Sequence, residues 1–164
     1  MRALLSLVAL GALGCASPEA PAGPQLVPGE RLGDVTLDMT YVQVVEVLGE
    51  PTGALVDSRI GFARFEGDVE VVFTSPEADA LTDDSRIIGI GLGTAGDYAG
   101  PALPGATRAE VEAALGPAPD SIESIDYYPH GISVEYDGDT VFRVAVLPPY
   151  ERRPDVPPMV GVDR

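Results

Sequence analysis

The chain has 164 residues and a formal net charge of −16 at pH 7, because 26 acidic side chains face ten basic ones. A protein this acidic repels phosphate backbones and anionic headgroups, which argues against nucleic acid partners and against electrostatic adsorption to a lipid surface. Cys15 is the only cysteine, so no disulfide can form within the chain and stability has to come from a packed core.

Residues 1–14 are predicted to be a signal peptide. Arg2 precedes an apolar run of eleven residues, 3–13, which is too short to cross a bilayer but suits a secretory signal. The run ends in Ala-Leu-Gly-Cys at residues 12–15, which resembles the lipobox of bacterial lipoproteins. The resemblance implies cleavage before Cys15, transfer of diacylglycerol to its thiol and acylation of the new N-terminus. The alternative is an ordinary signal peptide followed by a chance cysteine.

An acylated Cys15 would hold the protein on a bacterial membrane without a membrane-spanning segment. Two or three acyl chains, palmitate among them, anchor a protein stably. By its resemblance to enteric lipoproteins, in which an aspartate after the cysteine signals retention in the inner membrane, Ala16 implies the outer membrane, with the domain facing the periplasm. Residues 15–32 are therefore predicted to comprise the lipidated cysteine and a tether rich in proline, alanine and glycine.

Two short helices are predicted from a sequence motif that occurs twice in the chain. Residues 40–49 (TYVQVVEVLG) return 67 positions later as residues 107–116 (TRAEVEAALG). Each copy of the motif begins with threonine and has Gln or Glu three residues later, which is the pattern of a capping box. Each copy ends in glycine, and a proline follows closely. Helices this short are marginal alone, so each is expected to pack on strands.

Each predicted helix is followed by three predicted strands. They lie around 60–65, 69–73 and 88–92 after the first helix, and around 122–128, 132–136 and 142–146 after the second. Alternation places Ile88, Ile90 and Leu92 on one face of the first unit, and Phe142, Val144 and Val146 on one face of the second. The expected fold class is α+β: two tandem pseudo-repeats, each a short helix packed on a three-stranded antiparallel sheet.

The predicted organisation assigns 33–95 to the first unit, 96–147 to a linker and the second unit, and 148–164 to a proline-rich tail. The two units could share one continuous sheet or form two lobes with a groove between them. The glycines and prolines of residues 94–105 break regular structure, which favours two lobes.

The pattern of a capped helix with an apolar stripe and a Gly-x-Pro stop, followed by short strands, resembles two protein groups. One is the SmpA/OmlA-type outer-membrane assembly lipoproteins, and the other is the secreted proteins with tandem β-lactamase-inhibitor-like domains. The resemblance covers most of residues 33–147. It implies a non-enzymatic protein that binds or scaffolds other proteins.

Candidate catalytic and cofactor motifs each have a simpler explanation. Residues 91–96 match G-x-G-x-x-G, but no helix is predicted after them to receive a pyrophosphate, so we expect no nucleotide. His130, the only histidine, lies in a predicted turn between proline and glycine, which is a poor place for an oriented catalytic imidazole. Asp79, Asp83 and Asp84 are weak calcium candidates in an acidic loop that is expected to be solvated.

The sequence therefore predicts a lipid-anchored, non-catalytic binding or scaffolding protein without a cofactor. Tyr127 and Tyr128 are adjacent on a predicted strand, so one of them should face outward and could anchor an envelope protein or peptide. The alternatives are an envelope hydrolase that uses unidentified carboxylates and a weakly calcium-binding envelope domain.

Overall fold

The computed structural model describes residues 23–150. Cys15, the predicted signal peptide and residues 151–164 of the predicted tail lie outside the described residues. The helices are α1 (Tyr41–Leu48), α2 (Arg108–Leu115) and a 3₁₀ turn, Glu66–Asp68. The strands are β1 (Leu26–Val27), β2 (Arg31–Leu32), β3 (Val35–Thr36), β4 (Gly53–Asp57), β5 (Ile60–Phe65), β6 (Val69–Thr74), β7 (Arg86–Leu92), β8 (Asp120–Ile122), β9 (Ile125–Tyr128), β10 (Ile132–Asp137) and β11 (Thr140–Val146).

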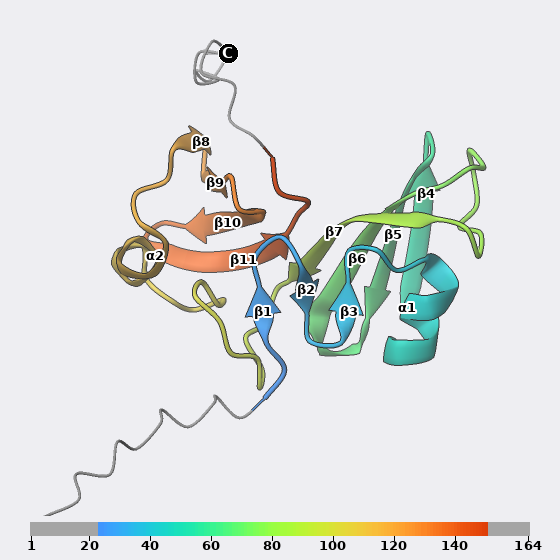
Figure 1. Cartoon of the computed structure of the whole chain (residues 1–164), viewed down its shortest axis with the longest axis horizontal. Helices are drawn as coiled ribbons and strands as arrows, with labels where there is room; N and C mark the ends of the chain where they lie inside the picture. The colour runs from blue at the N-terminus through green and yellow to red at the C-terminus, as the bar shows by residue number, and fades with distance from the viewer. Residues whose placement is uncertain (1–22, 151–164) are drawn as a thin grey trace, which may run out of the picture.

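One eight-stranded antiparallel sheet forms the body of the protein (Figure 1). Its order is β4-β5-β6-β7-β11-β10-β9-β8, so the strands that follow α1 make one half and the strands that follow α2 make the other. β7 and β11 join the halves through three residue pairs, among them Val144 with Leu92 and Val146 with Ile90. Backbone pairing therefore crosses the middle of the molecule.

The predicted fold class is wrong in its architecture. Each helix is followed by four strands instead of three, because β4 and β8 escaped prediction, and the strands merge into one sheet instead of two separate lobes. β4 and β8 are the two edge strands, and an edge strand does not need the alternating apolar pattern by which the other strands were found. A second, three-stranded sheet of β1, β2 and β3 was also not predicted.

Both helices form where the sequence predicts them, and their ends are set by the expected residues. The amide of Thr40 donates to Oε1 of Gln43 at 2.9 Å, and the amide of Thr107 donates to Oε2 of Glu110 at 2.8 Å, as capping boxes require. Gly49 and Gly116 end the helices with φ of 83° and 81°, a region that glycine enters at little cost.

The helices and the small sheet cover one face of the eight-stranded sheet (Figure 1). Val44 of α1 and Val111 of α2 are fully buried there. Leu26, Leu32 and Val35 of the small sheet join the same core. The folded body thus begins inside the range predicted to be a tether, since Leu26 and Leu32 provide buried apolar surface.

Two β-bulges make side chains of β7 and β11 face differently from the predicted alternation. The register shifts between Val72 and Phe73 opposite β7, and between Glu135 and Tyr136 opposite β11. As a result Ile87 and Val141 are buried, whereas Phe142 is 58 % exposed. Strict alternation had placed Ile88 on one face with Ile90, and Phe142 on one face with Val144, because a sequence pattern of period two carries no sign of an extra residue.

Candidate functional site

The face of the eight-stranded sheet opposite the helices is the candidate site, and we call it the open face. The strand register gives each strand one residue in a row across it. In strand order the row consists of Gly53, Arg64, Glu70, Gly91, Ala145, Ser133, Tyr127 and Asp120. Neighbours in this row lie on one side of the pleat, so side chains from both halves of the chain meet there.

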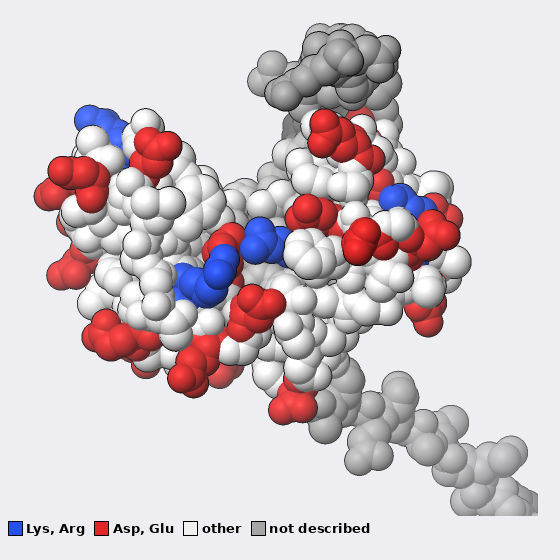
Figure 2. Space-filling model, turned by 180° about the vertical axis from the view of Figure 1, so that it is seen from behind, with Lys and Arg blue, Asp and Glu red and all other residues white. Residues whose placement is uncertain are grey.

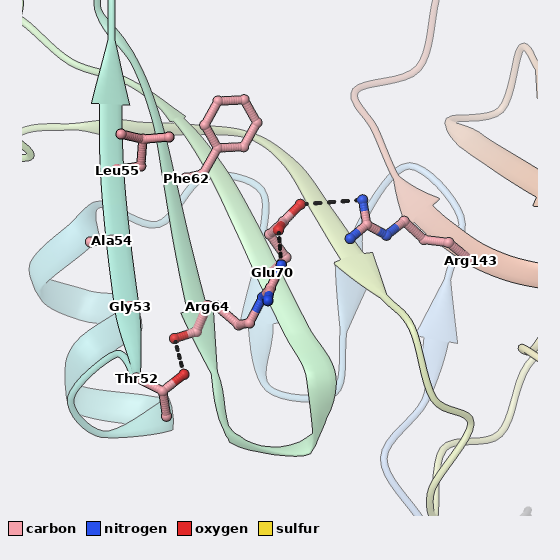
Figure 3. A pocket seen from close by; sticks show the side chains of 8 residues that line it. All are labelled: Thr52, Gly53, Ala54, Leu55, Phe62, Arg64, Glu70 and Arg143. Carbon is pink, nitrogen blue, oxygen red and sulfur yellow. Dashed lines mark hydrogen bonds and ion pairs between the residues drawn. The ribbon is translucent and has the colours of Figure 1, made fainter.

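A hollow of about 720 Å³ lies on this face (Figure 3). Its lining comes from β4 and the residue before it, from β5 and β6, and from β11 of the second half: Thr52, Gly53, Ala54, Leu55, Phe62, Arg64, Glu70 and Arg143. The central strand β7 presents Gly89 opposite Val72 and Gly91 opposite Glu70. Because glycine has no side chain, the surface of the open face is recessed along β7 at these two positions.

Glu70 lies between two arginines on the open face. Its Oε2 is 3.3 Å from Nη2 of Arg64, and its Oε1 is 3.3 Å from Nη1 of Arg143 (Figure 3). The arginine side chains are 61 % and 37 % exposed, and the glutamate only 18 %. One carboxylate therefore serves two guanidinium groups, which leaves a net positive charge and unused donors that face solvent.

This positive cluster is unusual in a chain of net charge −16. Figure 2 shows basic side chains near the middle of the molecule with acidic side chains beside them, and further basic side chains toward both sides. Anionic groups that approach the hollow thus meet the guanidinium donors of Arg64 and Arg143, while Glu70 and Glu135, which is paired with Arg143 across the strands, lower the local positive charge.

An apolar pair borders the charged cluster. Leu55 of β4 and Phe62 of β5 are directly opposed across the two strands and are 66 % and 37 % exposed. Large apolar side chains on an open sheet face lose contact with water only when something covers them. The hollow therefore combines an apolar wall with guanidinium donors, which is typical of a surface that binds another molecule.

A second polar cluster lies under α2, around a buried carboxylate. Asp126 is 3 % exposed, and its carboxylate accepts hydrogen bonds from Arg108 at 2.5 Å and Ser121 at 2.7 Å. The Arg108 guanidinium lies 3.8 Å from the centre of the Tyr136 ring. Burial, with the nearby Tyr128 and Asp126, raises the pKa of Tyr136 above its usual value. This cluster ties the first turn of α2 to β9 and β10.

The two tyrosines predicted as partner anchors lie on opposite faces of β9. Tyr127 is half-buried on the open face in the row described above. Tyr128 is 1 % exposed and belongs to the core, so it offers no surface to a partner. Burial, followed by the charge of Asp126, raises its pKa.

The other candidates from the sequence do not gather into sites. Within residues 23–150 no three His, Cys, Asp or Glu side chains lie close enough to hold a metal ion, and this includes Asp79, Asp83 and Asp84. His130 is exposed in its turn. Of the residues in the G-x-G-x-x-G match, Gly91 and Leu92 lie in β7, and the next helix after the match is α2, which begins at Arg108.

The residues of the hollow were missed because they come from strands whose neighbours the sequence does not specify. Alternation along β5 does separate Phe62 and Arg64 from the buried Ala63 and Phe65. Nothing in the sequence brings Arg143 to Glu70, because that contact depends on the pairing of β7 with β11.

No family model, curated protein or solved structure matches this chain. No helix in the described part of the chain has the length and apolar character needed to cross a membrane.

Proposed function

We propose that this protein is a lipid-anchored, non-catalytic binding or scaffolding protein of the bacterial cell envelope, and that it holds an envelope protein or peptide in the hollow of its open face. The observation that carries the proposal is the meeting of Leu55 and Phe62 with the Arg64–Glu70–Arg143 cluster around one hollow. Such a surface provides contacts for a partner through shape, apolar burial and charge.

The chemistry of the lining favours one kind of partner segment. An apolar side chain would be covered by Leu55 and Phe62, which are now exposed to water. A carboxylate would accept hydrogen bonds from Arg143 and Arg64 in the bidentate geometry that guanidinium groups favour. We therefore expect a segment that carries an acidic and an apolar residue close together.

The anchor is the second part of the proposal. Acylation of Cys15, which lies outside the described residues, would keep the body at the membrane, with the outer membrane favoured. The resemblance of the repeated helix motif to SmpA/OmlA-type lipoproteins and to β-lactamase-inhibitor-like domains supports a binding role. Mass spectrometry of the mature N-terminus is expected to find an acylated Cys15, and an unmodified N-terminus would contradict the anchor.

Photo-crosslinking in living cells tests the binding surface. A benzoylphenylalanine introduced at Phe62 is expected to give a defined adduct with one envelope protein, identified by mass spectrometry. The matched control is the same group at Ala113, which is exposed on α2, on the side of the sheet away from the hollow. Equal adducts at the two positions, or none at Phe62, would refute the proposal.

A charge variant adds a second readout. With Arg143→Ala the Phe62 adduct is expected to fall about tenfold, since the loss of one charge-assisted hydrogen bond is equivalent to about 1.4 kcal/mol or more. The melting temperature of the variant, measured alongside, shows whether the sheet has stayed folded. An unchanged adduct would exclude a role for the arginine.

A further inference from the structure

The edge strand β4 is the starting point for an inference about self-association. In residues 23–150, β4 has a strand neighbour on one side only, and the described backbone hydrogen bonds of Gly53–Asp57 reach β5 alone. Natural edge strands are usually blunted by lysine, proline, inward charges or bulges. Apart from its last residue, Asp57, β4 (Gly-Ala-Leu-Val-Asp) contains no charged side chain; it also contains no proline, and its pairing with β5 is regular.

The residue at the centre of this edge, Leu55, has the most exposed large apolar side chain in the described part of the chain. Leu55 is 66 % exposed, and its cross-strand partner Phe62 covers it on one side only. The opposite edge of the sheet, β8, has three residues and offers a shorter template. The two edges of the sheet thus differ in what they can bind.

We infer that β4 pairs with β4 of a second copy of this chain, antiparallel and centred on Leu55. A twofold axis through an antiparallel pair makes residue i of one copy face residue j of the other and the reverse. With Leu55 opposite Leu55 of the second copy, Asp57 lies opposite Gly53. The two leucines then shield each other, and each sheet gains one strand neighbour.

The charges of this register are complementary. Gly53 is paired with Arg64 on β5, so Asp57 of the second copy faces Arg64 across a position without a side chain. Arg64 has freedom to turn toward it, because its side chain is 61 % exposed and Glu70 keeps Arg143 as a partner. The pair forms twice in the dimer, once on each side of the axis.

The net charge of each copy opposes association but does not prevent it. Two chains of net charge −16 repel each other at long range, whereas exposed charges are screened beyond about 8 Å at physiological ionic strength. Each chain has a single β4 edge, so the pairing closes as a dimer and does not continue into fibres. The interface is small, so we expect a weak dimer that is best detected by covalent trapping.

Disulfide trapping of the full chain in the producing cells tests this inference. Leu55→Cys is expected to give a dimer on a non-reducing gel after mild oxidation, at least about tenfold more than Ala113→Cys, because directly opposed strand residues approach to disulfide distance. The wild-type chain reports any background from Cys15. Leu55 and Ala113 are both exposed, so neither substitution disturbs the core. Equal trapping at both sites, or none at Leu55, would overturn the dimer.

The register gives a second, independent test. Gly53→Cys and Asp57→Cys should each trap poorly alone and well when the two variants are produced together. A cysteine fits at Gly53, because no atom lies within 4 Å of the position its Cβ would take. Trapping that is no stronger in the mixture refutes the register. The identity of the Phe62 adduct separates the two proposals: an adduct with another envelope protein reports what the hollow holds, whereas an adduct with a second copy of the chain reports the β4 pair.

Discussion

Loss of the Arg108 guanidinium should destabilise the second half of the sheet strongly. Asp126 is 3 % exposed, and without Arg108 its carboxylate would keep Ser121 as its described partner. Removal of one member of a buried ion pair costs about 3–5 kcal/mol. The Arg108 side chain is 34 % exposed, so the lower end of that range applies. Loss of its contact with the Tyr136 ring adds about 1 kcal/mol.

We therefore expect Arg108→Met to lower the free energy of unfolding by about 3–4 kcal/mol, which corresponds to roughly 10–15 °C in melting temperature for a body of this size. Urea denaturation followed by circular dichroism measures it. Arg86→Met is the matched control, because Arg86 is exposed at the start of β7, and its effect should stay within about 0.5 kcal/mol.

The first half of the sheet indicates which second substitution should restore the stability lost in Arg108→Met. There Tyr41 takes the place of Arg108, Ala63 that of Asp126, and Phe73 that of Tyr136. Tyr41 packs edge-on against Phe73 with ring centres 5.5 Å apart. An apolar solution thus exists in the same sheet. Arg108→Met combined with Asp126→Ala should recover to within about 1.5 kcal/mol of the wild type. A single variant that loses less than about 1 kcal/mol, or a double variant no more stable than the single one, would refute this reasoning.

Three further predictions concern the backbone and the buried tyrosines. Arg59 has a φ of 71° in the tight turn between β4 and β5, so Arg59→Gly should raise the free energy of unfolding by about 0.5–1 kcal/mol, measured in urea; a loss would contradict strain there. Gly131→Ala should cost roughly 3 kcal/mol, since its Cβ would lie 2.5 Å from the Cα of Gly29 at a φ of 89°. The control Gly138→Ala, in open space at a φ of 60°, should cost about 1 kcal/mol, and equal melting temperatures would exclude the close contact. Burial raises the pKa of Tyr128 and Tyr136, so their contribution to stability is complete below the unfolded pKa of about 10 and is lost as the pH rises through the folded pKa. The urea midpoint should therefore fall as the pH rises above about 10, and fall less in Tyr136→Phe; an equal fall would show that other groups titrate.

The helices were predictable because their determinants are local. A capping box, an apolar stripe and a glycine stop all lie within ten residues, and the structure has α1 and α2 where those signals stand. The buried alternation of β6 and β10 was predictable for the same reason, since Val71 and Val134 lie in runs whose inward residues are apolar.

The elements that escaped prediction lack a local signal. β4 is an edge strand with four exposed residues among five, so it has no apolar face to read. β1 and β2 are two residues each in a stretch rich in proline and glycine, and they are ordered by contacts with distant segments. The amide of Leu26 donates to the carbonyl of Ala99 at 2.8 Å, and that of Gly29 to the carbonyl of Gly131 at 2.8 Å.

The sequence by itself determined the two capped helices, the core strands that follow them, and a charge that argues against nucleic acid and anionic lipid surfaces as partners. Only the tertiary structure decided that β7 pairs with β11, because strand pairing between distant segments depends on how the whole sheet closes its core and not on either strand alone. That one pairing makes a single sheet and brings Arg143 beside Glu70. The hollow of the open face exists because two halves of the chain, each with its own local pattern, share one surface.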